Sequence, residues 1–144
     1  MIEGGSIFKQ PNEKEFEQVK QLIEDFWLDN EDMKPEQFKV LLDSGKLIAF
    51  GRLREHNEAT ELCTLGVAKD YRCKGYGKEM VKHLINWTKR DVYVVTVIPE
   101  FFSKLGFSFI GKYPLPIQKK LENCSANYDV GVPYRAMKWE KIQI

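Results

Sequence analysis

Glycines and basic side chains are concentrated between Arg72 and Lys78, where their types and spacing suit the binding of an anion. Apolar residues at helical spacing over 80–85 predict a helix that begins near Gly77. The start of a helix leaves backbone N–H groups unpaired and carries partial positive charge. Gly75 and Gly77 would let the backbone approach a bulky anion closely. We therefore predict that this stretch holds a pyrophosphate group.

Three motifs in sequence order resemble those of the GCN5-related N-acetyltransferases (GNATs). R-C-K-G-Y-G at 72–77 is similar to the family signature Q/R-x-x-G-x-G/A, and C-T-L-G-V at 63–67 resembles the strand that precedes it. F-F-S-K-L-G-F at 101–107 resembles the family's F-Y-x-x-x-G-F. The resemblance extends from about Phe38 to Tyr113. The glycine-rich stretch matches neither the Walker loop nor the Rossmann fingerprint.

The resemblance implies acetyl-CoA as the cosubstrate, with direct attack of a primary amine on its thioester and no metal. It also implies a bulge near Gly66, which frees a backbone N–H for the oxyanion. The residues expected to bind the cosubstrate lie in the strand end and the glycine-rich turn: Leu65, Gly66, Val67, Arg72, Cys73, Lys74, Gly75, Tyr76, Gly77 and Lys78.

Glu61 is the candidate catalytic base, because some GNATs have a catalytic glutamate at the matching position. A lysine-like amine has a pKa about three units above pH 7, so its deprotonation costs roughly 4–5 kcal/mol and a base assists it. The alternative is a solvated carboxylate near the start of a strand. Many GNATs protonate the leaving thiolate with a tyrosine, but this chain has Phe102 there, which cannot donate a proton. Tyr93 is another possible donor.

Arg52, Arg54 and Arg135 are candidates for binding a carboxylate on the acceptor. Arg52 and Arg54 are two residues apart in an expected strand, so their side chains share one face. Guanidinium groups bind carboxylates through paired N–H donors. The alternative, which the residues themselves favour, is that all three are surface arginines at strand ends.

The elements that must position these residues follow from periodicity and turn signals. The sequence predicts helices near 13–28, from Gly77 onward and from Pro99 to Gly106. It predicts strands at 6–9, 38–42, 46–55, 59–67, 91–97, 107–113 and 134–139. Residues 117–132 are polar and poorly patterned, so we expect one helical turn around 118–122 followed by a loop.

Strands with interleaved helices indicate an α/β (α+β) fold with a mixed sheet. The GNAT resemblance implies six to seven strands and about four helices. A chain of 144 residues suits one domain, so we predict a single GNAT N-acetyltransferase domain over 1–144.

Composition narrows the class of protein further. The formal net charge is +1, which gives no electrostatic support for nucleic-acid binding. No apolar segment is long enough to span a membrane, and the first residues lack the pattern of a signal peptide. Three unevenly spaced cysteines suggest free thiols, and no Cys or His cluster has metal-ligand spacing. We expect a cytoplasmic protein that acts on a small-molecule amine or amino acid, without membrane association; the resemblance adds a possible homodimer.

A narrower resemblance concerns the acceptor. F-F-S-K-L-G-F, the Leu-Pro segment at 115–116 and the final R-A-M at 135–137 are similar to short acetyltransferases related to N-acetylglutamate synthase. That branch also has phenylalanine at the Phe102 position, and its tail often has more cysteines than the single Cys124 here. It implies an amino-acid acceptor. Two alternatives stay open: a non-catalytic acyl-CoA-binding sensor or regulatory module, and an interaction protein that keeps only the fold.

Overall fold

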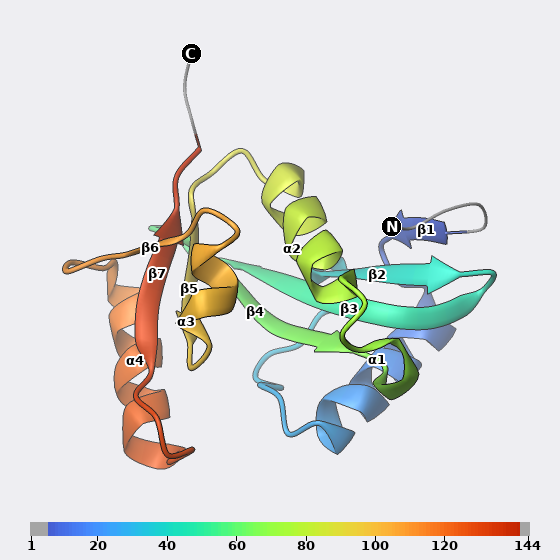
Figure 1. Cartoon of the computed structure of the whole chain (residues 1–144), viewed down its shortest axis with the longest axis horizontal. Helices are drawn as coiled ribbons and strands as arrows, with labels where there is room; N and C mark the ends of the chain where they lie inside the picture. Colours follow the sequence, from blue (N-terminus) through green and yellow to red (C-terminus); the bar gives the residue numbers. More distant parts are fainter. Residues whose placement is uncertain (1–5, 142–144) are drawn as a thin grey trace. The chain divides into compact units, whose positions relative to one another are not determined.

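The computed structural model describes residues 6–141 of the chain, which form seven strands and four α-helices (Figure 1). In chain order they are β1 (Ser6–Lys9), α1 (Glu13–Asp25), β2 (Phe38–Asp43), β3 (Lys46–Glu55), β4 (Thr60–Val67), α2 (Tyr76–Trp87), β5 (Val92–Thr96), α3 (Pro99–Ser103), β6 (Ser108–Phe109), α4 (Leu115–Asn127) and β7 (Arg135–Trp139). The strands hydrogen-bond in the order β1-β2-β3-β4-β5-β7-β6, with parallel and antiparallel pairs. The predicted α/β class with a mixed sheet is confirmed.

The chain divides into two compact units. The first contains residues 6–53 and 63–87, and the second contains residues 54–62 and 88–141. Strand β4 runs through both, because Thr60, Glu61 and Leu62 pair with β5 in the second unit. The rest of β4 belongs to the first unit.

In the first unit, an antiparallel meander carries a helix on each face. The hairpin predicted at Asp43-Ser44-Gly45 is present, and Ser44 and Gly45 both have positive φ, of 50° and 81°. Helix α1 packs Val19 and Ile23 into a core with residues of β2 and β3 that include Phe50. Gly51, on the other face of β3, leaves room for α2, since a Cβ there would lie 2.5 Å from the Leu84 side chain.

Helix α1 begins as predicted and ends earlier than predicted. Asn12 and Glu15 form a capping box, in which each side chain bonds the backbone N–H of the other residue. The helix ends at Asp25, before the expected residue 28, because Trp27 adopts a left-handed backbone with φ of 58°. The N–H groups of Trp27 and Leu28 return to carbonyls of the last turn, as in a Schellman motif. The indole of Trp27 is 94% exposed.

In the second unit, β5 pairs parallel with β4 and antiparallel with β7, so its predicted central place is confirmed. Helix α4 packs Ile117 against Ala59 and Ala136, beside Tyr93. Helix α3 begins with Pro99 at its first position, as predicted, and Gly106 beyond its end has φ of 99°.

Two predictions for the second unit are wrong. The expected strand at 107–113 is reduced to β6, Ser108–Phe109. Residues 115–127, expected to contain one helical turn and a loop, form the whole of α4. Pro114 and Pro116 suggested a break, but proline in the first turn of a helix loses no intrahelical hydrogen bond and has a suitable φ. Among the described residues, no helix is long and apolar enough to cross a membrane.

Candidate functional site

The predicted anion-binding stretch lies in the first unit, between the end of β4 and the start of α2. A short 3-10 turn, Lys69–Tyr71, leads into a loop in which Cys73 and Gly75 have φ of 63° and 89°. The first α-helical hydrogen bond runs from the Glu79 N–H to the Gly75 carbonyl, 3.0 Å away. The loop therefore delivers the free N–H groups of a helix start to a surface position.

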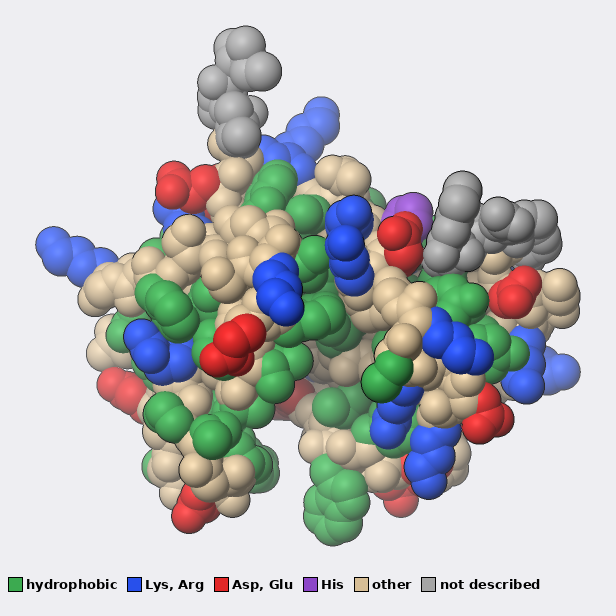
Figure 2. All heavy atoms as spheres, viewed as in Figure 1, with side chains coloured by type: hydrophobic (Ala, Val, Ile, Leu, Met, Phe, Trp, Pro, Cys, Tyr) green, Lys and Arg blue, Asp and Glu red, His purple; other side chains and the backbone are tan. Residues whose placement is uncertain are grey.

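The cations of this stretch are at the surface, and one of them is already engaged. Lys74 and Lys78 are exposed, and Figure 2 shows Lys and Arg side chains gathered where β4 leads into α2. Arg72 donates from Nε to the Val67 carbonyl at 3.0 Å, and its guanidinium lies 4.6 Å from the Phe26 ring centroid. Arg72 thus joins the end of β4 to the loop.

Lys46, at the start of β3, is a cation near this loop that the sequence did not indicate. Its Nζ lies 5.5 Å from the Tyr71 ring centroid, and the Nζ of Lys74 lies 5.9 Å from the same ring. A hollow of about 590 Å³ adjoins the loop, lined by Lys46 with the hairpin turn, α1 and Ala68. Lys46 is far from the loop in sequence, so no local pattern could have identified it.

Backbone irregularity in β4 lies at Thr64, two residues before the expected bulge at Gly66. Thr64 has φ of 53°, a left-handed conformation that is strained for a β-branched residue. Its hydroxyl donates to the Asp29 carbonyl at 3.0 Å, which holds it in place. Gly66 is required for another reason, since a Cβ there would lie 2.3 Å from the Phe50 ring.

Glu61 is buried in the second unit and both of its carboxylate oxygens are bonded. The side chain is 2% exposed. Its Oε1 lies 3.0 Å from Nε2 of His56, and its Oε2 lies 3.0 Å from Nζ of Lys120 in α4. The alternative of a solvated carboxylate is therefore wrong. Neither partner was predicted, and Lys120 comes from the helix that the sequence did not indicate.

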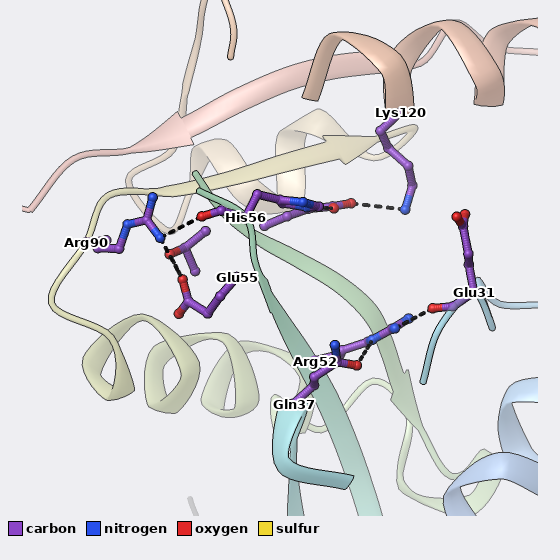
Figure 3. Close-up of polar contacts among 9 residues, drawn as sticks. Glu31, Gln37, Arg52, Glu55, His56, Arg90 and Lys120 are labelled. Carbon is purple, nitrogen blue, oxygen red and sulfur yellow. Dashed lines mark hydrogen bonds and ion pairs between the residues drawn. The ribbon is translucent and has the colours of Figure 1, made fainter. Parts of the chain in front are cut away.

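The turn that carries His56 is itself held by ionic and backbone contacts (Figure 3). Arg90 donates to the His56 and Asn57 carbonyls at 3.0 and 3.2 Å, and pairs with the Glu55 carboxylate at 3.0 Å. The His56 N–H also bonds the Ala59 carbonyl at 2.8 Å. The imidazole is 22% exposed, so the group joins a buried carboxylate to a partly exposed ring.

Phe102 has no hydroxyl that could donate a proton. Phe102 is buried, and its ring packs edge-on against Phe101 and Phe107. Tyr93 pairs with Glu61 in the register of β4 and β5, and the Nζ of Lys138 lies 5.6 Å from its ring. In the same unit, burial raises the pKa of the Tyr134 phenol, and the negative charges of nearby groups, Cys124 first, raise it further. Tyr93, the alternative donor that the sequence indicated, is thus the register partner of Glu61.

The three candidate arginines have different environments. Arg52 is fully buried in the first unit, so the surface interpretation is wrong for it. Arg54 is half-buried and belongs to the second unit. Arg135, also in the second unit, is exposed and its guanidinium lies 4.2 Å from the Phe109 ring centroid. The three arginines of the predicted carboxylate site thus differ in burial, and they belong to two different units.

In the described part of the chain, no group of three or more His, Cys, Asp or Glu residues could hold a metal ion. Cys63, Cys73 and Cys124, all within the described residues, form no disulfide bond.

Comparison with known proteins identifies the relatives of this arrangement. The profile of the Acetyltransferase (GNAT) family matches residues 6–107, which include all of the first unit's predicted site. Among solved structures, N-acetylglutamate synthase from Neisseria gonorrhoeae, crystallised with coenzyme A and L-arginine, is similar with a TM-score of 0.79 and 17% identity. The alignment covers 98% of this chain and 34% of that one, so the chain spans about a third of the synthase.

Two similar structures are of about the same length as this chain. The protein Rv2747 from Mycobacterium tuberculosis, crystallised with CoA, has a TM-score of 0.74 and 19% identity over 94% of this chain and 99% of its own. ElaA from Escherichia coli has a TM-score of 0.68 and 15% identity over 97% of this chain and 100% of its own. At these identities the likeness shows the shared fold.

Proposed function

The chain belongs to the acetyltransferase (GNAT) family, and we propose that it transfers the acetyl group of acetyl-CoA to the primary amine of a small molecule. The observation that carries this proposal is the loop from Arg72 to Lys78. Its two left-handed residues, its exposed lysines and the helix start behind it form an anion site within the matched region. Structures of similar fold were crystallised with coenzyme A.

The acetyl group moves in one displacement. The amine nitrogen attacks the thioester carbonyl carbon, the C–S bond breaks, and CoA leaves as a thiolate that takes up a proton. Backbone N–H groups of Leu65 to Val67, directly after the left-handed Thr64, are the proposed donors to the oxyanion. A thiolate is a fair leaving group because its conjugate acid has a thiol-like pKa. Tyr93 is the proposed donor of its proton, since Phe102 has none.

Glu61 is the proposed base that removes the amine proton, directly or through water. The Lys120 ammonium compensates the charge of the buried carboxylate. His56, hydrogen-bonded to the other oxygen and partly exposed, provides a path by which the accepted proton reaches solvent. The three side chains lie in one unit, so this proton path needs no other part of the chain.

The acceptor proposed here is a small amine, with amino acids included. The similar N-acetylglutamate synthase was crystallised with L-arginine and, in a second structure, with N-acetyl-glutamate. Membership in that branch is a proposal, supported by the Leu-Pro segment and by phenylalanine at position 102.

Isothermal titration with acetyl-CoA tests the proposal. We expect wild-type protein to bind with a Kd near 1 μM, about −8 kcal/mol. Lys74→Glu combined with Lys78→Glu should weaken binding at least about tenfold, because carboxylates there repel the pyrophosphate. Both positions are exposed, so the fold should persist, whereas a side chain at Gly75 would strain its backbone. Lys14→Glu combined with Lys104→Glu, at two other exposed positions, is the charge-matched control. Undetectable binding by folded wild-type protein would refute the proposal.

The buried phenylalanine at 102 favours one alternative, an acyl-CoA-binding sensor without catalysis. A screen of small amines with detection of the released CoA thiol separates the two functions. Thiol release that depends on an added amine supports the enzyme; tight acetyl-CoA binding with no release from any amine supports the sensor.

A further inference from the structure

Arg52 is a buried cation whose hydrogen bonds, within the described residues, go to neutral oxygens. It lies in β3, directly opposite Phe38 of β2, and its guanidinium is 5.5 Å from the Phe38 ring centroid. The side chain is 0% exposed. Charged side chains are almost never fully buried unless they are paired, because the loss of hydration is large.

Two of the three guanidinium nitrogens bond neutral oxygens (Figure 3). Nε donates to Oε1 of Gln37 at 3.0 Å, and Nη2 donates to the backbone carbonyl of Glu31. The same Gln37 oxygen accepts the Lys34 N–H at 3.1 Å, so its position is fixed from two sides. Nη1 is buried and has no hydrogen-bond partner.

The recorded contacts of Asp29 and Glu31 with this region run through the backbone. Glu31 offers its carbonyl to Arg52 while its own carboxylate points away, as Figure 3 shows. The Asp29 carboxylate accepts the Glu31 N–H at 3.0 Å, and the Asp29 carbonyl accepts the Thr64 hydroxyl. These bonds hold the 29–31 backbone against β3 and β4 and leave Nη1 oriented without an acceptor.

We propose that Nη1 of Arg52 binds the carboxylate of the acceptor, so that the substrate class is amines bearing a carboxylate, such as amino acids. This inference rests on the proposed acetyltransferase function. One unpaired nitrogen and one uncompensated positive charge match a monoanion, whereas a phosphate dianion needs more donors than this group offers. Gln37 and Glu31 act as positioning residues, since they fix the other two nitrogens.

Matched acceptor pairs test the inference. Each common amino acid is compared with its C-terminal amide, which keeps the amine and removes only the negative charge. With saturating acetyl-CoA, thiol release should show kcat/KM at least about 30-fold higher for the preferred acid than for its amide. Arg52→Lys should reduce this preference and Arg52→Met should abolish it, while the acetyl-CoA Kd stays unchanged.

Gln37→Glu is a second variant that does not remove the arginine. It places a carboxylate at the position of the amide oxygen that Arg52 already contacts, so the charge is compensated inside the protein. We expect a higher Tm and a loss of the preference for acids. Lys39→Met is the control, because Lys39 is a half-buried cation of β2 that lies near the Phe8 and Trp87 rings. It should leave the preference intact.

A binding measurement decides the inference without turnover. The preferred amino acid should raise the Tm of wild-type protein, and raise it far less for Arg52→Met or Gln37→Glu. Equal use of acids and amides, or a preference and Tm shift that survive in both variants, would overturn the carboxylate site and leave the acetyltransferase proposal standing. Failure of the proposed function would instead appear as absent acetyl-CoA binding in wild-type protein.

Discussion

Glu61 and Arg52 are both buried charged side chains that the sequence singled out as site candidates, yet their partners differ in kind. Glu61, 2% exposed, has a lysine on one oxygen and a histidine on the other. Arg52, 0% exposed, has a side-chain amide oxygen, a backbone carbonyl and one nitrogen without a partner. The protein compensates the first charge itself and leaves the second charge uncompensated.

The difference separates two uses of buried charge. A compensated carboxylate is stable at its position and can exchange protons with its partners. An uncompensated guanidinium raises the free energy of the folded protein until an anion arrives, so the binding of that anion is favoured. The two regions thus suit proton transfer and substrate binding, respectively.

The largest expected effect comes from removing the proposed base. Glu61→Gln keeps the shape of the side chain and one acceptor oxygen, which Lys120 can still use, and removes the basicity. We expect kcat/KM for the amine acceptor to fall by about 10² to 10³-fold, with the acetyl-CoA Kd unchanged, because general-base assistance is lost. Steady-state thiol release and titration calorimetry measure the two quantities. A fall of less than threefold would assign Glu61 a structural role.

Unfolding in urea compares the two charges directly. Glu61→Met removes the carboxylate that Lys120 and His56 contact, so we expect a loss of about 3–5 kcal/mol in the free energy of unfolding. Arg52→Met removes a charge that has no counter-ion, and the recovered hydration cost offsets the lost hydrogen bonds. We expect a change of less than about 1 kcal/mol for it.

Equal losses in the two variants would show that the protein compensates Arg52 as fully as Glu61. The contrast between the regions, and with it the inference about the acceptor, would then fail.

His56 allows the proton path to be tested with a smaller effect. His56→Ala should lower kcat about tenfold, because Glu61 keeps its Lys120 partner but loses its contact toward solvent. Added imidazole should restore part of the rate. His83→Ala is the control, since the His83 ring stacks on Phe8 at 4.0 Å in the first unit. A loss in kcat that imidazole does not change would reassign His56 to positioning the turn.

The loop from Arg72 to Lys78 could be predicted because the residues that determine its structure are close together in the sequence. Gly75 requires a left-handed backbone, and α2 follows from apolar periodicity within a few turns of chain. Helix α4 was missed because its apolar face is weak and its first turn contains proline, which by itself also signals a break.

The partners of the buried charges could not be predicted, because they depend on contacts between distant residues. Lys120 is 59 residues from Glu61, and Gln37 is 15 residues from Arg52. The sequence favoured a surface position for Arg52, because most arginines are exposed. The residue pattern of β3 did not indicate that this position is buried. Only the packed structure shows that the two charges differ.

A third carboxylate, Glu15 in the capping box of α1, gives the smallest effect and a reference for an ion pair outside the site. Burial acts to raise the pKa of Glu15, but the Asn12 N–H and the Lys9 ammonium outweigh it, so the pKa is lowered.

A carboxyl whose pKa is lower in the folded state stabilises the protein above its unfolded pKa, and this contribution is lost as pH falls through the folded pKa. Glu15→Gln should therefore cost about 0.5–1 kcal/mol at neutral pH and progressively less in acid, measured by urea unfolding across pH. Because Glu15 is compensated by a lysine that is 36% exposed, its loss should be well below that of Glu61→Met. A cost that equals the Glu61 value, or that grows in acid, would mean that burial contributes little to the contrast between the two regions.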